Sequence, residues 1–314
     1  MNKIIALCFF SFFIGHHASA QVWSYCGKQA FSDGEAFSQN IVIIDNTPYV
    51  AFDDRSNSGK ATVMKFTGDN WEPVGIKGFT AGAVGSLSFA GDENALYVAF
   101  RDVANGNKLS VMKFNGTDWV YVGDPGFTQY RCDVVSIDVS DGVPWIAFED
   151  VGENSKISVM KYSGGWTFVG KQGFNTGGMT NVIHLDVDGN TPYVAYRDYG
   201  ASYKASVMKF DGTNWLLLGL QGFSPGTYDS YQGLAVCNGI PYVAAWDTDA
   251  KLTVYKFDGS NWGEVGNRNF SNGQASSVNI KFSKTGIPHV AFKDVGQSNK
   301  GVVMALDGNS WKMV

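Results

Sequence analysis

Short runs of β-branched and aromatic residues, separated by turn residues, dominate this sequence. No window carries the apolar stripe of an amphipathic helix, with apolar residues at i, i+3, i+4 and i+7. The turns Ser140-Asp141-Gly142 and Ser163-Gly164-Gly165 suit the positive φ of tight hairpins. The pattern predicts an all-β chain, whose strands in one representative stretch are Val135–Val139, Trp145–Phe148, Ile157–Tyr162 and Trp166–Val169.

This four-strand pattern recurs along most of the chain. A glycine follows four residues, and a phenylalanine eight residues, after each of the first six tryptophans of the series. A period in the forties indicates a radial or stacked repeat, and about 40–50 residues suit one four-stranded propeller blade. The tryptophans lie 47 to 49 residues apart, at Trp23, Trp71, Trp119, Trp166, Trp215, Trp262 and Trp311.

The second and third strands of each unit are apolar on both faces, as in Ser110–Phe114. Such strands must lie between two neighbouring sheets. We therefore expect residues 21–314 to form one domain, a closed six-bladed β-propeller of four-stranded antiparallel blades. Trp23 begins a seventh copy of the fourth strand, which either competes with the Trp311 strand for one edge or adds a fifth strand.

Residues 1–20 have the pattern of a signal peptide. Lys3 supplies the positive start, Ile4–Ile14 the apolar core, and Ala18-Ser19-Ala20 the small-residue cleavage site. No later apolar run approaches the length of about 18 residues that a spanning helix needs. The sequence predicts export, to the cell surface, the medium or the periplasm, without membrane insertion.

Charge and cysteine content limit the classes of partner and the disulfides that the sequence predicts. Without Lys3, 23 basic residues face 29 acidic ones, and this acidic balance argues against nucleic acid as a partner. Once residues 1–20 are removed with Cys8, three cysteines remain: Cys26, Cys132 and Cys237. Their odd number and non-equivalent repeat positions predict no disulfide framework. No cofactor-binding motif is present, and we expect no cofactor.

An aspartate ends each second strand and a lysine opens each third strand, as at Asp150 and Lys156. We expect either a charge pair or an aspartate that binds turn amides; a ring of ligand carboxylates is the functional alternative. A second lysine recurs in the V-M-K-F motif, for example Lys209. Its stem should pack while its amine reaches water or an acid.

Two motifs resemble known families. The turn Phe210-Asp211-Gly212-Thr213-Asn214-Trp215 resembles the Asp-box hairpin of sialidase-type propellers, where it is structural. The whole unit, over residues 22–314, resembles the W-x-x-V-G, P-Y-V-A-Y-x-D and V-M-K-F-x-G-x-x-W repeats of exported proteins common in Bacteroidetes-like bacteria. That resemblance implies an extracellular propeller and brings no established activity. Seven-bladed fucose-binding bacterial lectins are similar in architecture, without a residue-by-residue match of sugar-contacting motifs.

Because repeated residues build the ring, a site is expected where the copies differ. The residue before each strand-ending aspartate varies most, and it should lie on the same rim as the variable connections between blades. Tyrosine, arginine and carboxylate groups on one rim suit sugar or peptide recognition, although a solvated loop face is the plain alternative. The candidate binding residues are Arg101, Tyr130, Arg131, Glu149, Arg197, Tyr199, Tyr228 and Trp246.

The innermost strands alternate between apolar and polar residues. His184, Asp186 and Lys281 belong to the polar set, which we expect to line a hydrated central channel. His184 and Asp186 together suggest a metal site, but ligand spacing elsewhere is missing, so no metal is predicted.

The sequence contains no H-E-x-x-H, G-x-S-x-G or phosphate-cradling motif. The leading hypothesis is a secreted, non-catalytic module that binds a glycan or a surface protein through its variable rim. A sialidase-like glycoside hydrolase or lyase is the second hypothesis, with Arg101, Arg131 and Arg197 meeting Tyr199 and Glu149 on one rim. A structural module of a surface complex is the third.

Overall fold

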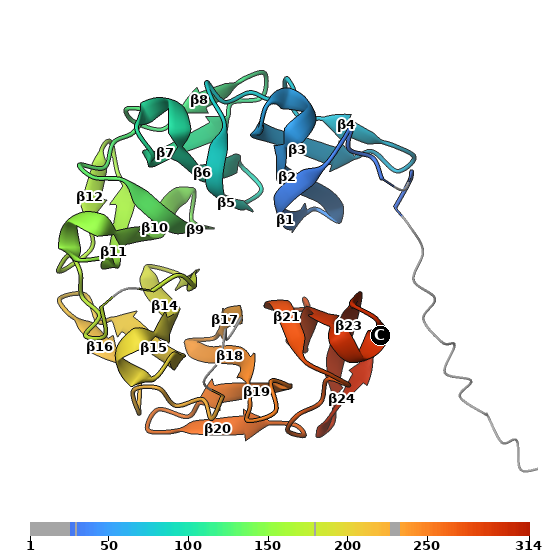
Figure 1. The fold of residues 1–314 in the computed structure, drawn as a ribbon, viewed down its shortest axis with the longest axis vertical. Helices are drawn as coiled ribbons and strands as arrows, with labels where there is room; N and C mark the ends of the chain where they lie inside the picture. Colours follow the sequence, from blue (N-terminus) through green and yellow to red (C-terminus); the bar gives the residue numbers. More distant parts are fainter. Residues whose placement is uncertain (1–25, 29, 179, 227–232) are drawn as a thin grey trace, which may run out of the picture.

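The computed structural model describes residues 26–28, 30–178, 180–226 and 233–314. The predicted signal peptide, the Trp23 strand and Tyr228 lie outside these residues. The described chain forms six four-stranded antiparallel sheets arranged around a central opening (Figure 1). The predicted fold, a six-bladed propeller of four-stranded antiparallel blades, is confirmed.

Each blade runs from its innermost to its outermost strand in sequence order. The first three blades are β1 (Ala36–Ile44), β2 (Thr47–Asp54), β3 (Lys60–Phe66) and β4 (Trp71–Pro73); β5 (Val84–Gly91), β6 (Leu96–Asp102), β7 (Lys108–Phe114) and β8 (Trp119–Tyr121); and β9 (Cys132–Ser140), β10 (Val143–Asp150), β11 (Lys156–Tyr162) and β12 (Trp166–Phe168). The last three are β13 (Ile183–Asp188), β14 (Thr191–Asp198), β15 (Lys204–Phe210) and β16 (Trp215–Leu217); β17 (Gly233–Cys237), β18 (Ile240–Trp246), β19 (Leu252–Phe257) and β20 (Trp262–Val265); and β21 (Ala275–Phe282), β22 (Pro288–Asp294), β23 (Lys300–Asp307) and β24 (Ser310–Met313).

Tryptophan joins each blade to the one before it. The Trp215 indole donates to the Val169 carbonyl of blade 3 at 2.8 Å, and its ring stacks on Phe174 with centroids 4.1 Å apart. Gly170 has φ +70°, and a Cβ there would lie 2.7 Å from Phe210 Cε2, so this position needs glycine. The W-x-x-V-G-x-x-x-F motif is therefore the joint between blades.

The strand-ending aspartates bind turn amides in every blade but the second, where Asp102 accepts from the Asn105 and Ser110 side chains instead. This decides between the two alternatives that the sequence left open. Asp150 accepts from the Gly152 amide at 3.1 Å and from the Ser158 hydroxyl at 2.8 Å. Among the described residues, no ion pair joins such an aspartate to the lysine that opens the next strand. The buried carboxylate thus holds the 3₁₀ turn between the second and third strands. These turns are η1 (Arg55–Asn57), η2 (Val103–Asn105), η3 (Val151–Glu153), η4 (Tyr199–Ala201) and η5 (Val295–Gln297).

The lysines of V-M-K-F have a different partner from the expected one. Their amines lie over aromatic rings of the second strand, where a cation is attracted to the ring face. Lys209 Nζ is 5.3 Å from the Tyr193 ring centroid, and Lys161 Nζ is 4.9 Å from that of Trp145. The same pairing joins Lys65 to Tyr49 and Lys113 to Tyr97.

The expected closure between the last and first blades is not formed by packing in the described part of the chain. Five apolar clusters join blades 1 and 2, 2 and 3, 3 and 4, 4 and 5, and 5 and 6. Blade 1 and blade 6 instead face each other across an open sector of the ring (Figure 1). The side chains that a closed ring would bury there, such as Ile41 and Ile43, are exposed.

Candidate functional site

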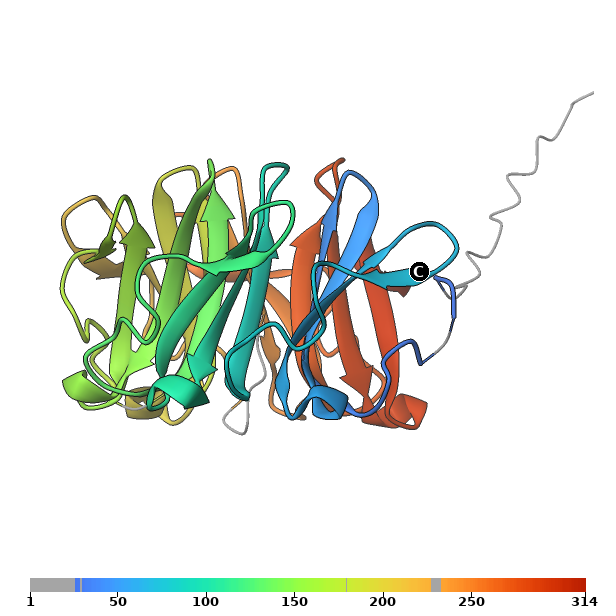
Figure 2. The same cartoon turned by 90° about the horizontal axis from the view of Figure 1, so that it is seen from above.

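The turns η1–η5 lie on one face of the ring (Figure 2). The connections between blades run along the same face, as shown by contact of Gly177 with Gly200 and of Tyr130 with Gly152. We call this face the connection rim. The prediction that variable hairpin turns and connections share one rim is confirmed.

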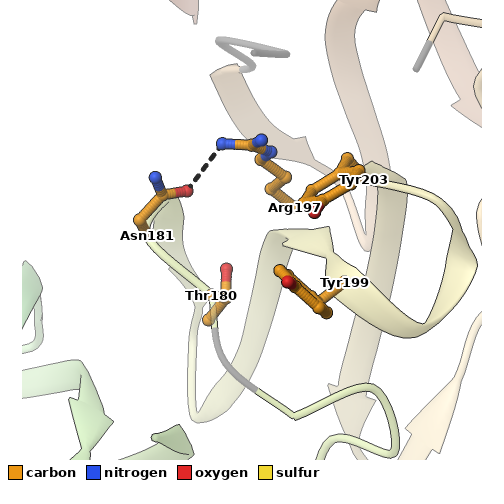
Figure 3. A pocket seen from close by; sticks show the side chains of 5 residues that line it. All are labelled: Thr180, Asn181, Arg197, Tyr199 and Tyr203. Atoms are coloured by element: carbon orange, nitrogen blue, oxygen red, sulfur yellow. Dashed lines mark hydrogen bonds between the residues drawn. The ribbon is translucent and has the colours of Figure 1, made fainter. Parts of the chain in front are cut away.

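A cavity of about 170 Å³ opens on the connection rim at blade 4. We call it the tyrosine cavity; it is lined by Thr180, Asn181, Arg197, Tyr199 and Tyr203 (Figure 3). Arg197 Nη1 donates to Asn181 Oδ1 at 3.0 Å, and the guanidinium carbon lies 4.6 Å from the Tyr203 ring centroid. Tyr199 packs edge-on against Tyr203, with centroids 4.7 Å apart, and remains 51% exposed.

Backbone geometry explains why these side chains converge. Asp198 accepts from the Gly200 amide at 3.0 Å and fixes η4, which carries Tyr199. Ser202 and Tyr203 both have positive φ, 57° and 64°, which turns the chain back into β15 beneath Arg197. A Cβ on Gly200 would lie 2.7 Å from the Gly177 Cα, so glycine allows the connection to touch the turn.

A second polar group lies at blades 2 and 3. Arg101 Nη1 and Arg131 Nη2 both reach Asp133, at 3.4 and 3.3 Å. Glu149 is buried beside them; burial raises its pKa, while a hydrogen bond from Ser155 acts in the opposite direction. We call Arg101, Arg131, Asp133 and Glu149 the arginine cluster.

The candidate residues therefore separate into two places. Arg197 and Tyr199 line the tyrosine cavity, while Arg101, Arg131 and Glu149 belong to the arginine cluster. Tyr130 is exposed and lies over Gly152 at the edge of blade 3. The single rim site that the glycosidase hypothesis needed, with Arg101, Arg131 and Arg197 around Tyr199 and Glu149, is not formed.

The prediction that Trp246 is a binding residue on the rim is wrong. Trp246 is only 3% exposed, and its indole donates to the Ala275 carbonyl at 2.7 Å, so it belongs to the core between blades 5 and 6. In the fifth unit the strand-ending aspartate and the next lysine are four residues apart instead of six. The shorter link between β18 and β19 contains no 3₁₀ turn. The ring of Trp246, the last residue of β18, points into the core.

Sequence comparison within the chain missed Tyr203. Its equivalents are Gly59, Asn107, Ser155 and Asn299, all suited to positive φ or small, so the position looked like a turn. The feature that could have identified Tyr203 is its aromatic side chain, because the other blades have small or amide residues at this position. Thr180 and Asn181 lie between β12 and β13, in one of the variable connections between blades.

The innermost strands line the central opening, as expected (Figure 1). Asp138 accepts from the Val187 amide at 2.7 Å, and Asp186 from the Val236 amide at 2.6 Å, so these carboxylates join neighbouring blades. Burial and then the Lys281 charge lower the pKa of His184 to about 4, which leaves its ring neutral at pH 7. Within the described chain, no group of three or more histidine, cysteine or acidic side chains suits a metal ion.

Asp138 should make stability depend on pH. Burial, followed by the neighbouring Asp186 charge, raises its pKa to about 7, whereas an unfolded aspartate titrates near about 3.9. Between these values the folded chain binds more protons at Asp138 than the unfolded chain does, so its contribution to stability falls as pH rises and is constant above about pH 7.

We therefore expect Asp138→Asn, which keeps an oxygen for the Val187 amide, to gain stability relative to the unaltered protein as pH rises from about 4 to about 7. Denaturant melts at pH 4.5, 6 and 8 measure this difference. Asp141→Asn, in an exposed turn with φ 51°, is the control. A difference between Asp138→Asn and the unaltered protein that stays constant over this range would contradict the assignment.

By sequence, the chain matches no protein-family profile and no curated protein. Solved structures do match. The Aleuria aurantia lectin, described as a six-bladed β-propeller with a novel fucose recognition mode, aligns at 15% identity with a TM-score of 0.57, over 88% of this chain and 95% of the lectin. The chain has the fold of the six-bladed lectins.

Two further structures show the range of this fold. The SapL1 lectin, solved with α-methyl fucoside, aligns at 13% identity with a TM-score of 0.60, over 88% of this chain and 94% of the lectin. The Trypanosoma rangeli sialidase in complex with sialic acid aligns at 14% identity with a TM-score of 0.54, over 90% of this chain and 53% of the sialidase. Across the described residues, the structure contains no helix long and apolar enough to cross a membrane.

Proposed function

We propose that this protein is an exported carbohydrate-binding protein that takes one sugar residue of a glycan into the tyrosine cavity. The observation that carries the proposal is that the half-exposed Tyr199 ring and the Arg197 guanidinium line one cavity on the connection rim. Export follows from the signal-peptide pattern of residues 1–20. Binding without catalysis is proposed because none of the described residues that line the cavity carries a carboxylate.

The chemistry of the cavity suits a sugar. A pyranose has an apolar C–H face, which packs on an aromatic ring, and hydroxyl groups that need donors and acceptors at fixed angles. Tyr199 offers the ring, and Arg197, Asn181 and Thr180 offer the polar groups. At about 170 Å³ the cavity is below the range of about 300–1,000 Å³ typical of drug-sized ligands, which favours a single sugar ring.

The fucose complexes of the Aleuria lectin and of SapL1 support a glycan ligand, because both proteins share this fold and the Aleuria lectin has the same number of blades. Fold similarity at this level of identity does not carry their ligand over. A surface protein as ligand is the competing outcome. A glycan array with the purified mature chain separates the two, and absence of binding to every glycan would refute the carbohydrate proposal.

Tyr199→Val gives a sharp test of the cavity, because blades 2, 3 and 6 carry Val103, Val151 and Val295 at this position of the turn. The turn should therefore fold normally while the stacking ring is lost. We expect the affinity for a glycan found on the array to fall about 10-fold, by titration calorimetry. Tyr130→Val, at the edge of blade 3, should leave affinity unchanged; equal losses in both variants would place the ligand elsewhere.

The arginine cluster favours a second candidate function, glycoside hydrolysis. Glu149 has a raised pKa next to Asp133, and two carboxylates of unlike character are what glycosidases use. Turnover of chromogenic glycosides, lost in both Glu149→Gln and Arg101→Ala, would establish it. Stable co-purification with one protein, without any sugar binding, would favour a structural module instead.

A further inference from the structure

The ring contains five copies of one interface between blades, and each copy shows what covers the faces of a blade. In every copy, the inner strand of one blade packs an apolar side chain against the blade before it. The same hydrogen bond recurs at the outer strand of each copy: a tryptophan indole donates to the carbonyl at the end of the preceding blade at 2.7–2.8 Å.

Blade 1 exposes the face that should meet a preceding blade. Ile41 pairs with Val50 in the register in which Phe89 pairs with Val98, so these two are equivalent positions. Ile41 is 62% exposed, and Ile43 on the same face is also exposed. The five equivalents of Ile41 are between 0% and 7% exposed: Phe89, Ile137, Leu185, Leu234 and Ile280.

Blade 6 exposes the opposite half of the same interface. Ala291 is exposed, whereas its equivalents Ala51, Ala99, Ala147, Ala195 and Ala244 are all fully buried against the next blade. Gly301 is exposed beside it on β23, and Val303 is half-buried. The two uncovered faces are therefore the two halves of one repeated interface, separated by an open sector (Figure 1).

At the outer edge of the open sector, blade 1 makes the contacts that other blades make with a preceding blade. The Trp71 indole of blade 1 donates to the Cys26 carbonyl at 2.8 Å, and Trp71 stacks on Phe31 at 4.3 Å. In blades 2 to 6 that carbonyl belongs to the end of the preceding blade's outer strand. Cys26 and Phe31 thus serve blade 1 as the end of a preceding outer strand does elsewhere, and the end of blade 6 does not occupy that place.

We propose that the faces of blades 1 and 6 form a docking site for a β-sheet of another polypeptide, which packs between them as a seventh blade. The occupant is an antiparallel segment of up to three strands with apolar side chains on both faces. Its inner strand would cover Ala291 and Val303, and its second and third strands would cover Ile41 and Ile43. These are the contacts that blades 2 to 5 make with their neighbours.

A chimera in which residues 84–118 are joined directly to Trp23 tests the fit. It places β5, β6 and β7 ahead of Trp23 with the spacing that they have ahead of Trp119. The readout is the labelling of Ile41→Cys by a maleimide, in a chain with Cys26→Ser and Cys237→Ser. Cys132 is fully buried, and burial raises its pKa to about 12, so it should not react.

We expect fast labelling of Ile41→Cys in the parent chain and labelling at least about 10-fold slower in the chimera. Ile240→Cys, exposed at the start of β18 in blade 5, is the control and should label equally fast in both. Slow labelling in the parent at every protein concentration would mean that the ring closes by itself, and it would overturn the proposal. Equal, fast labelling in parent and chimera would also overturn it.

A second measurement tests docking between separate chains. A fluorescent peptide of residues 84–114 is titrated with the unaltered mature protein. Binding that is lost in the Ile41→Asp, Ile43→Asp double variant and kept in Ile240→Asp supports the proposal. Failure of the peptide to bind would overturn it, and so would a concentration-dependent dimer that protects Ile41→Cys, because a second copy would then be the occupant.

Discussion

Replacing Trp215 by alanine should lower the free energy of unfolding by about 3–5 kcal/mol, the range for removal of a large buried aromatic side chain. The substitution removes the stack on Phe174 at 4.1 Å and leaves the Val169 carbonyl without its indole donor. It also opens a cavity between blades 3 and 4, where the surrounding strands cannot collapse because both belong to rigid sheets. Urea denaturation followed by circular dichroism gives the value.

Trp71→Ala is the matched control. Trp71 makes the same kind of indole bond and the same stack, but it lies at the open end of the ring and is only half-buried. Its replacement should cost clearly less than that of Trp215. Equal losses would mean that the first blade is covered in solution, which would also contradict the open sector. Trp215→Phe, which keeps most of the stacking area, separates the indole bond from the packing.

Asp198→Ala is expected to have a comparable effect, a loss of about 3–5 kcal/mol, because it removes the carboxylate that accepts three hydrogen bonds, and a hydrogen bond to a charged group contributes about 1.5–3 kcal/mol. Asp198 is fully buried and accepts from the Gly200 amide, from the Ser206 hydroxyl at 2.8 Å and from Gln221 Nε2 at 2.9 Å. The change leaves the fully buried Ser206 hydroxyl without this acceptor, while the Gly200 amide, in an exposed turn, and the half-buried Gln221 side chain can turn to water. Since the same carboxylate holds η4, the position of Tyr199 and any glycan binding should be lost with it.

Asp211→Ala provides the comparison. Asp211 also accepts from two backbone amides, those of Thr213 and Asn214, but it lies in an exposed hairpin. Water replaces its bonds, so the loss of stability should be much smaller. If both variants lost the same stability, burial would not be what makes the strand-ending aspartates important.

The arginine and first tyrosine of the cavity were predictable from differences among the repeated units. Arg197, near the end of β14, and Tyr199, in η4, occupy positions that vary between blades and lie next to the variable connections. Tyr203 was not predictable in the same way, because its place beneath Arg197 depends on two successive residues with positive φ. Trp246 was placed wrongly because its ring packs between blades 5 and 6, and variation of a position between blades does not show whether its side chain faces solvent; Glu149, at the equivalent position, is also buried.

Period-two patterning and tryptophans 47 to 49 residues apart are local properties of the chain, so they suffice to predict the all-β class, the number of units and the strands of each blade. How far the blades turn around the axis, and therefore that Ile41 and Ala291 remain uncovered, depends on the packing of the whole ring. That angle comes from the summed packing of five interfaces. No single stretch of sequence encodes that sum.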